Sequence, residues 1–170
     1  MLPPGHIAAS YILIKSVELA GFRISGAETL LVLATSLVLD FDLLPANFLK
    51  RNHHDLISHT PLGAFILWLI FVFIVGDYLS PTGQILILLS LLLHLLLDEA
   101  GFWLCRLKLQ GVSREPQITW LYPWAKFPRR KDRETVFQFS FFKNYFQKAK
   151  ANVVLEMILS LTALLMLWLT

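Results

Sequence analysis

A histidine and an aspartate stand four residues apart in one of the most apolar stretches of the sequence. The stretch runs from Leu91 to Gly101 and places His94 and Asp98 among leucines. Side chains four residues apart lie one turn apart on the same face of a helix, so the imidazole and the carboxylate can bind one metal ion. Ionisable groups inside a membrane span are costly and are therefore functional candidates. The pair predicts a metal site within an apolar helix.

The composition is that of a membrane protein. Of the 170 residues, 56% are hydrophobic and 16% are charged, which leaves too little polar surface for a soluble globule. The single cysteine, Cys105, excludes an intramolecular disulfide and a cysteine-rich zinc site. No secretory signal is recognisable at the N-terminus, so we expect the first helix to be retained.

The apolar runs predict an all-α fold, a polytopic membrane bundle of four to five helices in a single domain. The expected spans cover about residues 6–20, 27–41, 62–79, 84–104 and 151–170. The first run is only weakly apolar, so the sequence leaves open whether it crosses the membrane or lies partly in the interface. Pro61 suits the first turn of the third of these helices.

A basic segment between the last two spans, residues 105–150, contains most of the positive charge and the aromatic residues Trp120 and Trp124. Such side chains favour the boundary between lipid tails and anionic head groups, so we expect this segment to contact membrane lipids, and no nucleic acid. Short loops rich in Lys and Arg stay in the cytoplasm. We therefore expect a prokaryotic inner-membrane protein whose basic segment faces the cytoplasm.

This orientation brings further polar residues to the level of the opening pair. Counting spans backwards from the basic segment places these side chains at cytoplasmic helix ends: His6, Asp40, Asp42, His54 and His59. Each residue alone is as well explained by a hydrogen-bonded core histidine or a solvated helix terminus. Their occurrence together is the stronger signal.

Zinc is the divalent ion that this donor set suits best, because it accepts imidazole nitrogen and carboxylate oxygen. One aspartate of Asp40-Phe41-Asp42 can join His59 and the opening pair around an ion. Two carboxylates two residues apart do not share a helical face, so the other aspartate would orient a ligand or bind a second ion. His6 is the candidate for that second ion, sharing Asp98. We expect one or two divalent ions.

The order of these motifs resembles that of the YdjM-like membrane-bound metal-dependent hydrolases, which are distantly related to zinc-dependent phospholipase C. The similar blocks, over about residues 4–124, are Pro4-Gly5-His6, Asp40-Phe41-Asp42, His54 to Thr60, His94 to Asp98 and Trp120 to Trp124. The resemblance implies one metal held by Asp42, with Asp40 as the alternative, and by His59, His94 and Asp98. It implies a second metal at His6 and Asp98. An arginine that the family has after its first loop histidine is replaced here by Asp55.

Residues and resemblance together predict a membrane-bound hydrolase in which the metal activates water to attack a phosphoester. A site at the lipid boundary favours a lipid-like substrate. His54 is a candidate acid or base. The candidates for neutralising a phosphate, chosen for their position along the chain, are Lys50, Arg51 and Arg106.

Two other classes of function remain open. A metal-ion or proton carrier would use the same residues as a path, although residues 62–79 and 84–93 offer almost no polar group besides Ser90. A non-catalytic scaffold would use a structural metal to join short helices. The sequence does not determine the substrate, the metal or the oligomeric state.

Overall fold

The computed structural model describes residues 1–48, 53–109, 116, 118–125, 145–147 and 149–169. Within them the chain is helical and contains no strand, which confirms the expected all-α fold. Four stretches of these residues are long and apolar enough to cross a membrane: Gly26–Ala46, Pro61–Tyr78, Pro81–Arg106 and Lys150–Leu169. The composition is therefore explained by membrane-spanning helices.

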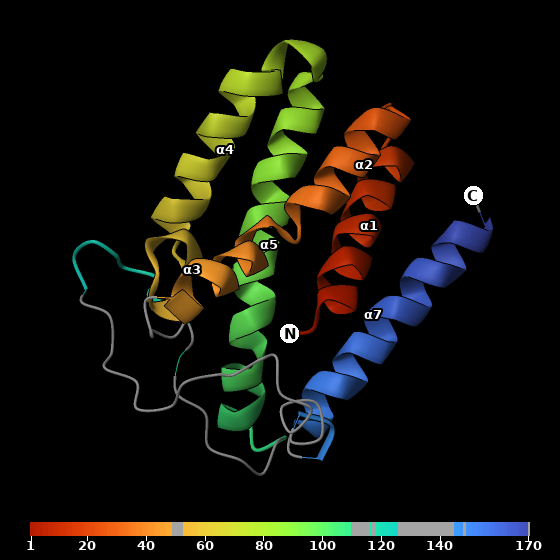
Figure 1. The fold of residues 1–170 in the computed structure, drawn as a ribbon. Coiled ribbons are helices and arrows are strands. Elements are labelled where there is room, and N and C mark those ends of the chain that lie inside the picture. Colours follow the sequence, from red (N-terminus) through yellow and green to blue (C-terminus); the bar gives the residue numbers. More distant parts are fainter. Residues whose placement is uncertain (49–52, 110–115, 117, 126–144, 148, 170) are drawn as a thin grey trace.

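The longest helix, α5 (Pro81–Arg106), lies at the centre of the bundle (Figure 1). Its 26 residues rise about 39 Å, more than the roughly 30 Å of a bilayer's hydrocarbon core. It contacts all of the other long helices, which are α1 (Pro3–Leu19), α2 (Gly26–Thr35), α4 (Pro61–Val75) and α7 (Lys150–Leu169). Every helix of the bundle is thus positioned against the helix that carries His94 and Asp98.

The side of α5 that faces α1 and α2 forms an apolar core. Leu86, Ile87 and Leu91 are buried there against Ile14 of α1 and Val32 of α2. Lipid tails are as apolar as these side chains, so close van der Waals packing, rather than exclusion from water, favours the association. Polar contacts between helices then add specificity.

Helices α4 and α5 begin in the same way. The hydroxyl of Thr60 accepts a hydrogen bond from the Gly63 N–H at 3.0 Å, and the hydroxyl of Ser80 accepts one from the Gly83 N–H at 3.0 Å. Pro61 lies in the first turn of α4, as predicted. The N–H groups of that turn have no partner within the helix, so proline, which has no N–H, costs no hydrogen bond there.

The apolar run at 27–41 is not one straight helix. Helix α2 ends at Thr35, and the 3-10 helix η1 (Val38–Asp42) and the short helix α3 (Leu43–Phe48) follow. The hydroxyls of Thr35 and Ser36 donate to the carbonyls of Val32 and Leu33, a pattern that bends helices. Figure 1 shows η1 and α3 passing α5 from the end of α2 towards the start of α4.

The expected first span corresponds to α1, whose 17 residues rise about 26 Å. Within the predicted basic segment, the described residues include a turn at Trp120 to Trp124 in which both tryptophans are exposed. Residues 126–144 of that segment lie outside the described part of the chain, as do Lys50 and Arg51.

Candidate metal centre

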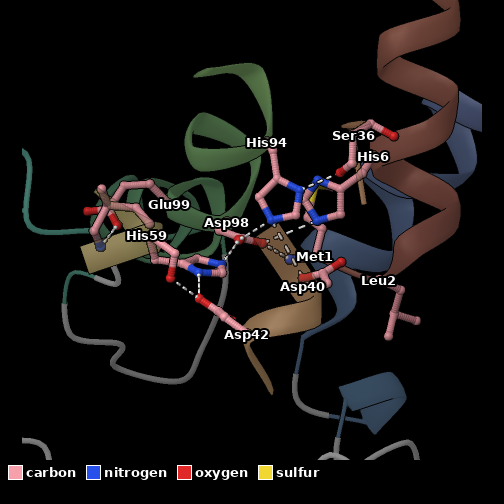
Figure 2. A network of polar contacts seen from close by, with 12 residues as sticks. Met1, Leu2, His6, Ser36, Asp40, Asp42, His59, His94, Asp98 and Glu99 are labelled. Carbon is pink, nitrogen blue, oxygen red and sulfur yellow. Dashed lines mark hydrogen bonds and ion pairs between the residues drawn. The ribbon is translucent and has the colours of Figure 1, made fainter. Parts of the chain in front are cut away.

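Histidine and aspartate side chains from four parts of the chain meet around Asp98 of α5 (Figure 2). They form two overlapping groups, and within each group the ligand atoms lie within 4.8 Å of one another. The first group is His6 of α1, Asp40 of η1, and His94 and Asp98 of α5. The second group is His54, His59 and the same Asp98. His54 belongs to the 3-10 helix η2 (His53–Asp55) and His59 to η3 (Ile57–His59).

Asp98 presents a different carboxylate oxygen to each side. Its Oδ1 lies 3.3 Å from Nε2 of His6 and 2.6 Å from the amino nitrogen of Met1. Its Oδ2 lies 3.1 Å from Nε2 of His94 and 3.6 Å from Nε2 of His59. A carboxylate with histidines on both sides could bridge two ions through its two oxygens, whereas an amide at this position would offer only one oxygen.

The ring of His94 is held by the bend that ends α2. Its Nδ1 donates to the backbone carbonyl of Ser36 at 2.7 Å, which leaves Nε2 directed towards the carboxylates. This Nε2 also lies 3.5 Å from Oδ1 of Asp40. The ring stacks on His6, with centroids 3.9 Å apart and planes 15° apart. The bend in the apolar run therefore brings Asp40 to the site and fixes His94.

The ring of His59 is held by the second aspartate of the Asp-x-Asp motif. Its Nδ1 lies 2.6 Å from Oδ2 of Asp42, which also accepts a hydrogen bond from the Ser58 hydroxyl. A carboxylate behind a histidine in this way orients metal-binding imidazoles in many proteins. In this structure Asp40 belongs to a ligand group and Asp42 orients His59, which is one of the two arrangements predicted for the motif.

The position of η3 depends on close contact with α4. A Cβ atom on Gly63 would collide with the backbone carbonyl of Ile57, so glycine lets the turn that carries His59 pack against the first turn of α4. Burial disfavours the charged form of His59, but the hydrogen bond with Asp42 and the nearby carboxylate of Asp98 outweigh burial and raise its pKa to about 9. Without a metal, the imidazole is therefore protonated at neutral pH.

The first group fits a cation because its inner atoms lack other partners. Four buried atoms have no hydrogen-bond partner among the described residues: Nε2 of His6, Nε2 of His94, Oδ2 of Asp40 and Oδ2 of Asp98. His6 and His94 are each 1% exposed and Asp98 is 6% exposed. Buried polar atoms without partners are unfavourable, and a divalent cation among two imidazoles and two carboxylates would satisfy them.

The first group is most accessible beside Asp40. The side chain of Asp40 is 21% exposed, whereas that of Asp98 is 4% exposed. A pocket of about 190 Å³ adjoins it, lined by Pro3, Leu37, Asp40 and Phe41. Apart from the carboxylate, this lining is apolar.

The remaining predicted residues lie apart from this arrangement or outside the described chain. His54, predicted as an acid or base, is buried in the second group, and its ring meets His59 edge-on at 4.9 Å. Arg106 is exposed at the end of α5, and its backbone lies about 12 Å along the helix from Asp98. Lys50 and Arg51, predicted to neutralise a phosphate, belong to residues that the structure does not describe.

Two acidic residues near the centre were not predicted to matter. Glu99 is 2% exposed, and its Oε2 accepts the N–H of Ile118 at 2.9 Å, which holds the chain after α5 against the helix. Glu156 of α7 is 9% exposed and bonds to the start of α1. The signal in both cases is an acidic residue in an apolar helix, the same signal that identified Asp98.

Comparisons of this chain with models of protein families, with curated proteins and with solved structures find no match. Functional conclusions therefore rest on the residues of the centre, on their geometry and on the membrane setting.

Proposed function

We propose that this protein is a membrane-bound metal-dependent hydrolase that cleaves a phosphoester at the cytoplasmic face of a prokaryotic inner membrane. The observation that supports it best is that two ligand groups share one carboxylate, Asp98. Sites that hold two ions about 3.5–4 Å apart are typical of phosphatases and nucleases, because both the attacking and the leaving oxygen are stabilised.

The proposal gives each residue a role. One ion would be held by the first group and the other by the second, with Asp98 between them. Divalent ions, with zinc best suited to these donors, supply activation of water and polarisation of the phosphoryl group. Ser36 and Asp42 keep the rings of His94 and His59 in the ligand orientation.

Asp40 is the residue where the reaction would take place. It belongs to the first group and also lines the adjoining pocket. Its side chain is 21% exposed, so it is the acid of the first group that water reaches most readily, and its carboxylate could accept the proton of the attacking water. His54, which the sequence predicted as an acid or base, would then act as a ligand, and Asp40 would be the base.

The pocket favours an amphiphilic substrate. Its walls beside Asp40 are Pro3, Leu37 and Phe41, and Phe41 is 66% exposed. These residues lie at the start of α1 and within the apolar stretch Gly26–Ala46. A phosphoester attached to hydrocarbon would place its apolar part against these walls and its ester at Asp40.

A carrier is less well supported by the contacts above His94. One turn before His94 in α5, the hydroxyls of Ser90 and Ser10 lie 2.8 Å apart, so polar contacts continue for a short distance. One turn beyond them, Ile87 and Ile14 are fully buried. This apolar layer opposes passage of an ion. In sealed vesicles, we expect no metal uptake that depends on His94.

Adjacent acids offer a matched test of the proposal. The protein is purified in mild detergent, and bound metal and hydrolysis of p-nitrophenyl phosphate monoesters and alkyl diesters are measured. Asp98→Asn and Glu99→Gln each remove one buried negative charge at neighbouring positions. We expect Asp98→Asn to lose metal and hydrolysis, and Glu99→Gln to keep both. A wild-type protein that binds no metal overturns the proposal, as does hydrolysis that survives complete chelation.

A further inference from the structure

In the last helix, α7, the only buried side chains are polar. Among its described residues, Asn152 and Glu156 are buried, and Glu156 is its single acidic residue. Helix α7 lies beside α1 (Figure 1). A buried carboxylate in an apolar helix is unfavourable unless its partners compensate, so its contacts indicate its role.

Glu156 bonds to the segment that starts α1. Its Oε1 accepts the backbone N–H of Leu2 at 2.6 Å and the hydroxyl of Tyr145 at 2.6 Å. Leu2 is the N-cap residue of α1, whose start lacks a hydrogen bond from a capping side chain of its own. The carboxylate therefore interacts with a helix N-terminus, where negative charge is favourable.

Gly5 allows this approach. A Cβ atom at Gly5 would lie 3.0 Å from Cγ of Glu156, closer than ordinary van der Waals contact. The side chain of Glu156 thus bonds to the backbone of Leu2 and passes close to Gly5. His6, a member of the first ligand group, is the next residue.

His6 differs from the other histidines around Asp98 in how it is held. His94 and His59 use Nδ1 to bond to the Ser36 carbonyl and to Asp42. Nδ1 of His6 has no hydrogen-bond partner among the described residues, and its Nε2 faces Oδ1 of Asp98 at 3.3 Å. Metal-binding histidines usually donate their second N–H to an orienting group, and His6 lacks one, so its direction is set by the backbone of α1 and by its stacking on His94.

We propose that Glu156 is a positioning residue for the candidate metal centre. By holding the start of α1, it directs His6 towards Asp98 and sets the affinity of the ion held by the first group. The inference rests on the proposed metal site. It makes α7, which contributes no residue to either ligand group, a part of the centre.

The test is a double-mutant cycle on metal affinity. Zn²⁺ binding is measured by competition with a chromophoric chelator for wild type, Glu156→Ala, His6→Ala and the double variant, all in detergent. We expect Glu156→Ala to weaken binding of one ion about 10–100-fold, the effect of losing an orienting group. In the His6→Ala background, the same substitution should have little further effect, because its action passes through His6.

Glu28→Ala is the matched control, since it removes another buried glutamate at the opposite end of the bundle. It should lower stability without changing zinc affinity. Unchanged affinity in folded Glu156→Ala overturns the inference, and so does an equal loss with and without His6. If Glu156→Ala does not fold, Gly5→Ala displaces the same contact more gently. It should weaken the binding of one ion by shifting His6. A folded Gly5→Ala variant with wild-type zinc affinity also overturns the inference.

Failure of the two proposals can be told apart in the same experiment. A wild-type protein that binds no zinc overturns the metal centre itself and the inference with it. Wild-type binding combined with variants that behave independently of His6 overturns only the role of Glu156.

Discussion

Two buried carboxylates, those of Glu28 and Asp98, have very different surroundings. Glu28 has protein donors for both oxygens: Oε2 accepts the N–H of Ser25 at 2.8 Å, and Oε1 accepts the N–H of Ser80 at 2.8 Å and its hydroxyl at 2.6 Å. Asp98 instead faces the ligand nitrogens of histidines (Figure 2). Burial alone therefore does not identify a functional acid. The chemistry of the surrounding atoms does.

Glu28 is explained by helix capping. With Ser25 it forms a capping box at the start of α2, and through Ser80 it reaches the start of α5. A Cβ atom on Gly83 would lie 2.5 Å from Oε1 of Glu28, so glycine admits the carboxylate to the first turn of α5. The Oδ2 of Asp98, in contrast, has no hydrogen-bond partner among the described residues and lies 3.1 Å from Nε2 of His94.

The largest expected difference between Glu28 and Asp98 is in how their variants change stability when metal is removed. Chelation should destabilise the wild type by about 4 kcal/mol when zinc is present at roughly 1,000 times its dissociation constant, because the ion binds only the folded state. Thermal unfolding in detergent, with and without chelator, measures this. Glu28→Ala should keep the same increment, and Asp98→Ala should lose it. An increment that persists in Asp98→Ala would contradict a metal shared at that residue.

The next largest effect is the loss of stability when Glu28 is replaced. Glu28→Ala removes the charged acceptor of three hydrogen bonds from Ser25 and Ser80, and we expect a loss of about 2–4 kcal/mol in unfolding free energy. Unfolding in detergent measures this loss, and metal analysis of the same sample should match the wild type. Loss of metal in Glu28→Ala would show that the two ends are coupled.

A smaller effect separates Asp42 from Asp40 within one motif. Asp42→Asn removes the charged partner of His59 but no member of either ligand group. We expect about 10–100-fold weaker binding of the ion held by the second group. Asp40→Asn should instead weaken the ion of the first group. Metal competition assays on both variants test this, and the reverse assignment would favour Asp42 as the ligand.

The smallest effect is the dependence of metal affinity on pH. His59 has a pKa of about 9, so below that pH the metal must displace a proton from its imidazole. Affinity for the second ion should rise about tenfold per pH unit between pH 7 and 9 and then level off. Asp42→Asn, which lowers that pKa, should flatten this dependence. Chelator competition across the pH range measures both slopes.

Much of the fold could be predicted from the sequence because long apolar runs specify membrane helices directly. In a bilayer, backbone groups must bond within their own segment, so each long run becomes helical. Local chemistry also predicted the start of α4 at Pro61 and the pairing of His94 with Asp98 one turn away. These features depend only on residues close together in the chain.

Features that depend on distant residues were not predictable in the same way. The bend after Thr35 depends on hydroxyl groups and on the bond from His94 to Ser36, so it is fixed only when α2 packs on α5. The grouping of His54 with His59 depends on the close approach of η3 to α4 at Gly63. The contact between Glu156 and Leu2 joins residues 154 positions apart.

The sequence by itself determined that this is a helical membrane protein with histidines and aspartates suited to a divalent metal. Residue type and helical spacing suffice for that conclusion. Only the tertiary structure decided how those ligands divide, with Asp98 shared between two groups and Asp42 behind His59. The physical reason is that a ligand group is defined by distances of a few ångströms between side chains on different helices, and packing alone sets those distances.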